Sequence, residues 1–388
     1  MAETDKKQYR YVSAGSRRGG CGGMGSEDGR GRGAVLSAAS FLWILWCVLG
    51  CSPAESEPSR EALTIVSWNV QALFDGHDDG HEYNEYREEA GWTDEKYRAR
   101  LNAIAAAMDG LKPGIMALIE LENPGVLQDL AELSGQDYRW SFFAGAPESS
   151  TGLGVLSRFP LEDTKAHSLC IDGSAVPRPV AEVRVNTGSG TVLLLVCHWK
   201  SKLGGEQQTE TVRRSQAGII ARRLEEIAAA EPGTPVIVLG DLNENYDEFL
   251  RTGGAYLCAL LPDTGEAAEL AKPVPASPRP GFQDFLVLSE EKPPRPELFG
   301  GQALYSPWME LRDSSGSYYY QGEWETIDHF LLNAALFNGE GWEYEAFLLP
   351  EESPFRSAAG IPRAYNPRTG NGLSDHLPII LNLKYQGG

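Results

Sequence analysis

Short apolar runs alternate with polar segments along most of the chain. Eight runs of six to eight residues are rich in Val, Ile and Leu and end at Gly, Pro or Asn, a pattern typical of buried strands. The predicted strands cover residues 63–70, 114–121, 152–157, 180–185, 191–198, 235–240, 327–332 and 377–383.

Three segments have apolar residues at helical spacing instead. Thr93 can cap a helix that opens with two acidic residues and runs to Leu111. The same spacing predicts helices over residues 126–133 and 217–227. Helices interleave with strands early in the chain, whereas strand follows strand later, which predicts an α/β protein with mixed sheets.

Two segments break this pattern. Residues 262–307 hold 9 of the 24 prolines and show little periodicity, so we interpret them as a long loop or insertion. Residues 76–89 form a second, acidic insertion that contains His77 and His81. A solvated loop explains this insertion better than a metal site, because nothing in its spacing fixes a coordination geometry.

The first residues differ from the rest of the chain. Arg30 and Arg32 precede an uncharged run over residues 34–50, and Cys51 follows it. A basic segment before an apolar run is typical of a secretory signal, and the run is short for a membrane span, which needs about 20 residues.

Residues 48–51, Val-Leu-Gly-Cys, resemble the lipobox of bacterial lipoproteins, whose cysteine carries the lipid. We therefore expect a signal peptide over residues 1–50, lipidation of Cys51, a polar tether over residues 51–62 and an extracytoplasmic, membrane-anchored protein. An uncleaved anchor helix is the alternative, and it places the protein on the same side of the membrane.

Charge and cysteine content narrow the function. The chain has 34 Lys and Arg against 54 Asp and Glu, a net charge of −20. This argues against tight, sequence-blind binding to nucleic acid through a basic surface, but not against an enzyme that meets a polyanion transiently. Beyond the leader, Cys170, Cys197 and Cys258 form neither a disulfide framework nor a metal-binding spacing.

Polar residues stand at the ends of several predicted strands, which is where open α/β folds place their sites. They supply carboxylates, amides and imidazoles, but no nucleophilic Ser or Cys in a recognisable elbow. The motifs are Ser-Trp-Asn-Val at 67–70, Ile-Glu-Leu-Glu-Asn at 119–123, Cys-His-Trp-Lys-Ser-Lys at 197–202, Gly-Asp-Leu-Asn at 240–243, Thr-Ile-Asp-His at 326–329 and Ser-Asp-His-Leu-Pro at 374–378.

In content and order, these six motifs resemble the endonuclease/exonuclease/phosphatase superfamily, the deoxyribonuclease I-like fold. The resemblance covers some 320 residues. It implies a four-layer α/β sandwich, in which two mixed β-sheets pack face to face with helices outside, within a domain over residues 63–385. It also implies metal-dependent cleavage of a phosphoester by water.

The resemblance assigns the metal to three residues. They are Asn69, Glu120 and Asp375. Hard carboxylate and amide oxygens suit Mg²⁺, with Mn²⁺ and Ca²⁺ as alternatives. Glu122 is a weaker candidate, and capping of the following helix is its competing interpretation.

Catalytic roles follow in the same way. Asp241 and Asn243 would orient or deprotonate the attacking water, and Asp328 would hold the imidazole of His376. His198 matches the other histidine of the family. His329 would point away from Asp328 by strand alternation, so we interpret it as structural.

Basic side chains are expected on the substrate phosphate. Arg178 matches a basic residue that the family often places near the substrate, and Lys200 and Lys202 follow the histidine motif. Trp68 and Trp199 flank site residues, and core packing is a better interpretation of both than base stacking.

We interpret the chain as an extracytoplasmic, monomeric, Mg²⁺-dependent nuclease acting on DNA or RNA, because residues 198–205 resemble secreted nucleases of the superfamily. A phosphatase or phosphodiesterase acting on inositol phosphates or phospholipid head groups uses the same core and is the alternative. A surface binding lipoprotein that has lost catalysis is the second alternative.

Overall fold

The computed structural model describes residues 61–147, 149–171, 174–265, 284–294, 303–311 and 316–387. The expected signal peptide, Cys51 and nearly all of the tether lie outside the described residues.

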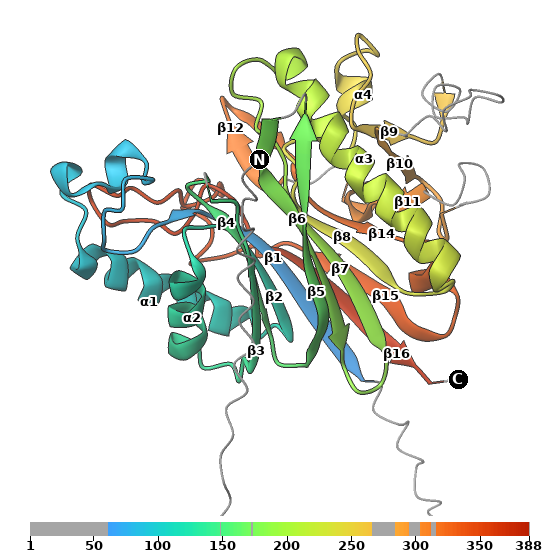
Figure 1. The fold of residues 1–388 in the computed structure, drawn as a ribbon, viewed down its shortest axis with the longest axis horizontal. Helices are drawn as coiled ribbons and strands as arrows, with labels where there is room; N and C mark the ends of the chain where they lie inside the picture. The colour runs from blue at the N-terminus through green and yellow to red at the C-terminus, as the bar shows by residue number, and fades with distance from the viewer. Residues whose placement is uncertain are drawn as a thin grey trace, which may run out of the picture.

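Two mixed sheets form the centre of the molecule (Figure 1). In strand order, the six-stranded sheet consists of β15 (Gly341–Leu348), β16 (Ile379–Gln386), β1 (Ala62–Leu73), β2 (Ile115–Leu121), β4 (Gly152–Ser157) and β3 (Trp140–Ala144). The eight-stranded sheet consists of β5 (Leu161–Ile171), β6 (Ser174–Asn186), β7 (Thr191–His198), β8 (Val236–Asp241), β14 (Asp328–Leu332), β11 (Ala303–Tyr305), β10 (Leu286–Ser289) and β9 (Leu260–Pro262).

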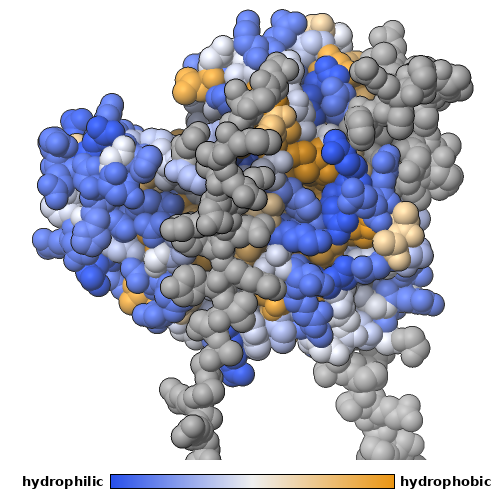
Figure 2. All heavy atoms as spheres, viewed as in Figure 1, coloured by the Kyte–Doolittle hydropathy of each residue, from blue (hydrophilic) through white to orange (hydrophobic). Residues whose placement is uncertain are grey.

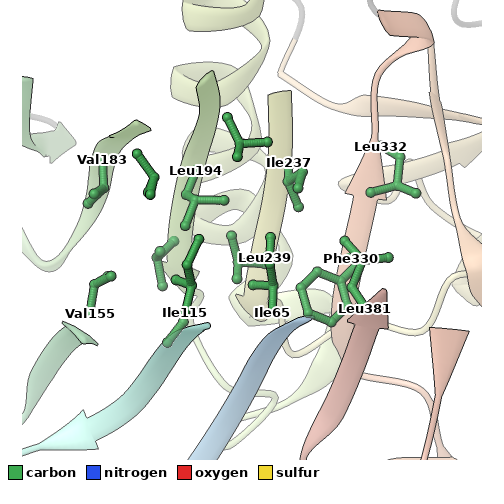
Figure 3. Packing of buried hydrophobic residues seen from close by; sticks show 14 of the residues in the cluster. Ile65, Ile115, Val155, Val183, Leu194, Ile237, Leu239, Phe330, Leu332 and Leu381 are labelled. Carbon is green, nitrogen blue, oxygen red and sulfur yellow. The ribbon is translucent and has the colours of Figure 1, made fainter. Parts of the chain in front are cut away.

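The sheets pack face to face through alternate residues of their strands. Figure 3 shows Ile65 and Ile115 of one sheet opposite Leu194 and Ile237 of the other, all of them fully buried. Each sheet contains a parallel pair of inner strands, β1 with β2 and β7 with β8, so the carboxyl ends of each pair come to one edge. The face-to-face arrangement expected from the sequence is confirmed.

Helices cover the outer faces. α1 (Asp94–Leu111) and α2 (Pro124–Leu133) pack on the six-stranded sheet, and α3 (Glu206–Ala230) packs on the eight-stranded sheet. The Thr93 hydroxyl accepts from the Lys96 N–H, so the predicted helix cap is confirmed. The short helices are α4 (Glu248–Arg251), η1 (Asn84–Tyr86), η2 (Glu88–Ala90), η4 (Pro307–Glu310) and η5 (Ala334–Phe337).

All eight predicted strands are present, but the expectation of a structureless segment over residues 262–307 is wrong in part. β10 and β11 lie within it and extend the eight-stranded sheet. β3, β5 and β15 were also missed, as were β12 (Tyr318–Tyr320) and β13 (Glu323–Glu325), which form a separate hairpin.

The surface is mainly polar, as expected from the charge. Hydrophilic residues predominate on the face in Figure 2, and hydrophobic ones appear in small groups. Within the described part of the chain, no helix is long and apolar enough to cross a membrane. Cys170 is exposed, Cys197 and Cys258 are buried, and all three are free thiols.

Candidate active site

The candidate site lies where the two sheets meet, and one amide joins them. Asn69 on β1 is buried, and its Nδ2 donates to Glu120 Oε1 of β2 at 3.2 Å and to Asp241 Oδ2 of β8 at 3.0 Å. Glu120 belongs to the six-stranded sheet and Asp241 to the eight-stranded one. The two carboxylates are therefore held together only while the sheets are packed.

The orientation of this amide is fixed by its neighbours. The N–H of Gln71 donates to Asn69 Oδ1 at 3.0 Å, so the oxygen faces the backbone and the nitrogen faces the carboxylates. Gln71 also reaches the other end of the chain, because its Oε1 accepts from the backbone N–H of Asp375 at 3.0 Å. One glutamine thus aligns Asn69 with Asp375.

Several site residues have left-handed backbone conformations. φ is +56° at Gln71, +54° at Ala72, +70° at Glu120 and +52° at Asn243. Such angles are unfavourable for residues with side chains and persist only where the surroundings impose them. The β1–β2 register shifts at these positions, which turns Glu120 out of the regular alternation.

A buried arginine supports the strained segment of β1. Arg100 on α1 is 2% exposed, and its guanidinium donates to the carbonyls of Val70, Gln71 and Ala72 at 2.6 to 2.9 Å. Its charge also lies over the ring of Tyr365, 3.9 Å from the centroid. These carbonyls point away from the sheet ladder, and the guanidinium satisfies them.

His376 and Asp328 form a buried pair. His376 Nδ1 lies 2.7 Å from Asp328 Oδ2, and the Ser317 hydroxyl donates to the same oxygen at 2.6 Å. Burial opposes a charge on His376, but the carboxylate of Asp328 and the charges of Asp375 and Asp241 raise its pKa well above the ordinary value. His376 is therefore positively charged, with both ring nitrogens protonated. Its Nε2 lies 4.0 Å from Asp241 Oδ2.

The second histidine is neutral. His198 Nε2 lies 3.6 Å from Glu120 Oε1 and 3.7 Å from Asp241 Oδ2. Burial and the nearby positive charge of Arg178 lower its pKa well below the ordinary value. An uncharged imidazole therefore lies beside the carboxylates.

Burial and nearby negative charges destabilise the ionised forms of the site carboxylates. Burial and the negative charge of Asp328 raise the pKa of Asp241 to about 7. Burial and the charge of Asp375 also raise the pKa of Glu120. Acidic oxygens in this setting are stabilised by a nearby cation, because it offsets both desolvation and mutual repulsion.

This donor set fits a hard divalent cation. Glu120 and Asp375 would hold it through carboxylate oxygens, and the 34% exposure of the Asp375 side chain leaves access from solvent. Asn69, the third predicted ligand, donates its Nδ2 to Glu120 and so holds that carboxylate in place. A bound Mg²⁺ would neutralise charge on a phosphoryl group.

The three basic residues expected near the substrate phosphate differ in their contacts. Arg178 donates to the carbonyl of Trp199, and it lines a pocket with His198, Tyr83 and Thr151. Lys200 Nζ bonds to its own loop at Ser201 and Leu203, and Lys202 Nζ pairs with Glu248 at 2.9 Å and Glu325 at 3.7 Å. Of these three basic residues, only Arg178 lines this pocket.

Behind the site, α3 holds the loops that carry it. Arg213 is fully buried and pairs with Glu210 and with Glu244, which follows Asn243 in the chain. It also donates to the carbonyl of Lys200 at 3.2 Å, while Gln216 accepts from the Lys200 N–H at 2.9 Å. The loops after β7 and β8 are thereby fixed to one helix.

The structure brings most predicted residues together. Asn69, Glu120, His198, Asp241 and His376 lie within direct or near contact of one another, with Asp328 and Asp375 around His376. Asn243 is adjacent: its N–H donates to Asp241 and its Nδ2 donates to the Trp199 carbonyl.

Sequence reasoning missed the residues that hold the site in place. They are Gln71, Arg100, Arg213, Ser317 and Ser374, whose hydroxyl donates to the Asn69 carbonyl at 2.6 Å. Ser374 is the first residue of the last motif, and Gln71 directly follows the first motif, which was the available signal. The structural interpretation of His329 agrees with its burial and its 2.8 Å contact with the Glu244 carbonyl.

The acidic insertion is separate from this site. Asp79, Glu82 and Glu122 place ligand atoms within 4.8 Å of one another, and Glu122 Oε2 accepts from the Asp75 N–H at 2.6 Å. Glu122 thus faces the insertion rather than Glu120. The cap of α2 is Asn123, whose side chain accepts from the Val126 N–H.

Comparison with known proteins identifies the class. The sequence model of the Endonuclease/Exonuclease/phosphatase family matches residues 64–254. Over these residues the chain is similar to this family, as the motifs indicated. Comparison with curated protein sequences found no match.

One solved structure has a similar fold, and two others are similar at lower scores. An endonuclease/exonuclease/phosphatase protein from Beutenbergia cavernae is 17% identical, with a TM-score of 0.50, 85% of this chain covered and 72% of that chain. Truncated TDP2 from Caenorhabditis elegans is 16% identical, with a TM-score of 0.49 and coverage of 83% and 98%. A family protein from Bacteroides thetaiotaomicron is 13% identical, with a TM-score of 0.48 and coverage of 84% and 98%.

Proposed function

We propose that the protein is a Mg²⁺-dependent phosphodiesterase that cleaves nucleic acid by attack of water on phosphorus. One observation carries the proposal: Asp241 and His376 lie 4.0 Å apart with pKa values raised by different causes. Asp241, with a pKa of about 7, can accept a proton near neutral pH, while the imidazolium of His376 can donate one.

The remaining residues complete this chemistry. Glu120 and Asp375 would bind the metal, and Arg178 and His198 face the space where the phosphoryl group would lie. Nucleic acid is proposed as substrate because the segment after His198 resembles secreted nucleases of the superfamily. A binding protein that had lost catalysis would normally have replaced at least one of these residues, and all of them are present.

The test uses the full chain in detergent, with Mg²⁺ or EDTA, on plasmid DNA, single-stranded RNA, inositol phosphates and choline phosphodiesters. We expect metal-dependent cleavage of nucleic acid, reduced at least about 100-fold in Asp241→Asn and His376→Gln. His167→Gln is the control, because His167 pairs with Glu182 instead.

The alternatives give different results in the same experiment. Turnover of inositol phosphates or choline esters alone would replace the nuclease with the head-group hydrolase. Folded protein that is silent on every substrate would favour the binding lipoprotein.

We also propose that the protein is anchored outside the cytoplasm through lipid on Cys51. The support is the run over residues 34–50 and the lipobox-like segment that ends in Cys51. Cys51→Ser should block lipid labelling and release the protein from the membrane fraction. If the substituted protein stays in that fraction, an uncleaved helix is the anchor.

A further inference from the structure

A hairpin of unusual composition stands beside the candidate active site. β12 and β13 pair Tyr318 with Glu325, Tyr319 with Trp324 and Tyr320 with Glu323. Gln321 and Gly322 have φ of +50° and +93°, as a tight two-residue hairpin turn requires. The turn therefore fixes which side chains share a face.

The base of this hairpin is built into the catalytic centre. Ser317, directly before β12, donates to Asp328 Oδ2 at 2.6 Å, and its carbonyl accepts from the Leu377 N–H at 2.8 Å. Tyr318 forms an isolated antiparallel bridge with His376. The hairpin is thus fixed relative to the two residues that carry the proposed proton transfer.

One face of the hairpin carries a row of rings that starts at the catalytic imidazole. The ring of Tyr318 lies 4.6 Å from that of His376, tilted by 33°. Tyr320, two residues further on, lies nearly parallel to Tyr318, at 16° and 6.2 Å between centroids. Tyr320 is 51% exposed, so the row ends in solvent.

The opposite face is closed by packing. Tyr319 packs edge-on against Trp324 at 5.1 Å, and the guanidinium of Arg356 covers the same tryptophan at 5.3 Å. Packing therefore explains Tyr319 and Trp324. It does not explain the exposed ring of Tyr320.

The charged residues beside the rings of Tyr318 and Tyr320 indicate which class of ligand these rings could bind. Glu323 and Glu325 are the cross-strand neighbours of Tyr320 and Tyr318, so they share the face of the rings. Lys202, which reaches Glu325, is already paired with Glu248. Such a face repels phosphate. It accepts a flat, uncharged ring whose amino groups can donate to carboxylates, which describes a nucleobase.

A cationic head group is the competing ligand, because rings and carboxylates also attract quaternary ammonium. Cation sites of that kind surround the charge with rings at different angles. Here the planes of Tyr318 and Tyr320 differ by only 16°, an arrangement suited to stacking.

We propose that Tyr318 and Tyr320 form a stacking subsite for the base that adjoins the scissile phosphate, an inference that rests on the proposed nuclease function. A base can reach this row only when it is unpaired and out of the helical stack. The substrate class is therefore single-stranded or frayed nucleic acid rather than intact duplex.

The experiment uses the full chain and a single-stranded oligonucleotide in which one phosphodiester is cleavable and the others are methylphosphonates. A matched substrate replaces the base on either side of that phosphodiester with an abasic spacer. Tyr320→Ala should raise KM about tenfold on the complete substrate, with kcat little changed. Tyr320→Phe, which keeps the ring, should behave as the native protein.

On the substrate that lacks the stacked base, the native protein and Tyr320→Ala should have equal KM, and duplex should be cleaved more slowly than the single strand. A Tyr320→Ala effect that persists without either base, or no effect at all, would overturn the subsite while leaving the nuclease intact. Cleavage of choline phosphodiesters but not of oligonucleotides would remove both the subsite and the proposed function.

Discussion

Replacing Arg213 with methionine tests the buried network behind the site. Arg213 Nη2 lies 2.5 Å from Glu210 Oε2, and Nε lies 3.3 Å from Glu244 Oε2. Both glutamates are buried and also accept from backbone N–H groups, Glu210 from Ala259 and Glu244 from Leu260. Arg213→Met therefore leaves two buried carboxylates without their cation.

Removing one partner of a buried ion pair costs about 3–5 kcal/mol, which is a large part of the stability of a typical domain. We expect a loss of this size at pH 7.5 in urea unfolding followed by tryptophan fluorescence. Burial already raises the pKa of Glu244, and loss of the guanidinium raises it further. The folded variant then binds more protons than the folded native protein, so the loss should shrink as the pH falls towards 5.

Arg214→Met is the matched control, because Arg214 lies on the same helix but is 27% exposed and pairs with Asp284, which is 43% exposed. It should lose at most about 1 kcal/mol. Arg213→Met with Glu244→Gln should recover part of the stability. A loss below about 1 kcal/mol, or a larger loss that is equal at pH 5 and pH 7.5, would refute the reasoning.

Two further predictions concern the site charge and the core. Because the pKa of Asp241 is raised, the metal-free protein should lose stability as the pH rises from about 4 towards 7. Urea unfolding midpoints measured in EDTA should therefore fall over this range, and they should fall less steeply in Asp241→Asn or with Mg²⁺ present. Equal slopes in all three cases would contradict the assignment. Leu194→Ala, between the sheets, should cost about 3–5 kcal/mol by urea unfolding, whereas Leu133→Ala, at 45% exposure, should stay within about 0.5 kcal/mol; similar losses for both would contradict the packing.

The sequence predicted the strands whose two faces are both buried, because such strands form continuous apolar runs. β5 and β15 were missed since exposed and buried residues alternate irregularly along them, and β10 and β11 since they have four and three residues. These short strands form only because a neighbouring strand is already present to pair with them, which is a tertiary effect.

The chemistry of the site was more predictable than its support. Asn69, Asp241 and His376 lie in or directly beside apolar runs, where their polarity is conspicuous. Arg100 and Gln71 act through the backbone, by satisfying carbonyls of a strained segment and by aligning two amides. No pattern in the sequence predicts such a role, because the role depends on φ values and on partners up to 304 positions away.

The dependence of the site on both sheets has a consequence for folding. Trp68 bonds to the carbonyl of His376 across 308 positions, and Ser374 bonds to the carbonyl of Asn69 across 305. Contacts between such distant segments form slowly, because long loops must close first. We therefore expect the candidate active site to be one of the last parts to assemble, so that a chain with only its separate hairpins and helices formed has no activity. Hydrolytic activity should then require the completely folded molecule, and an activity assay would measure complete folding.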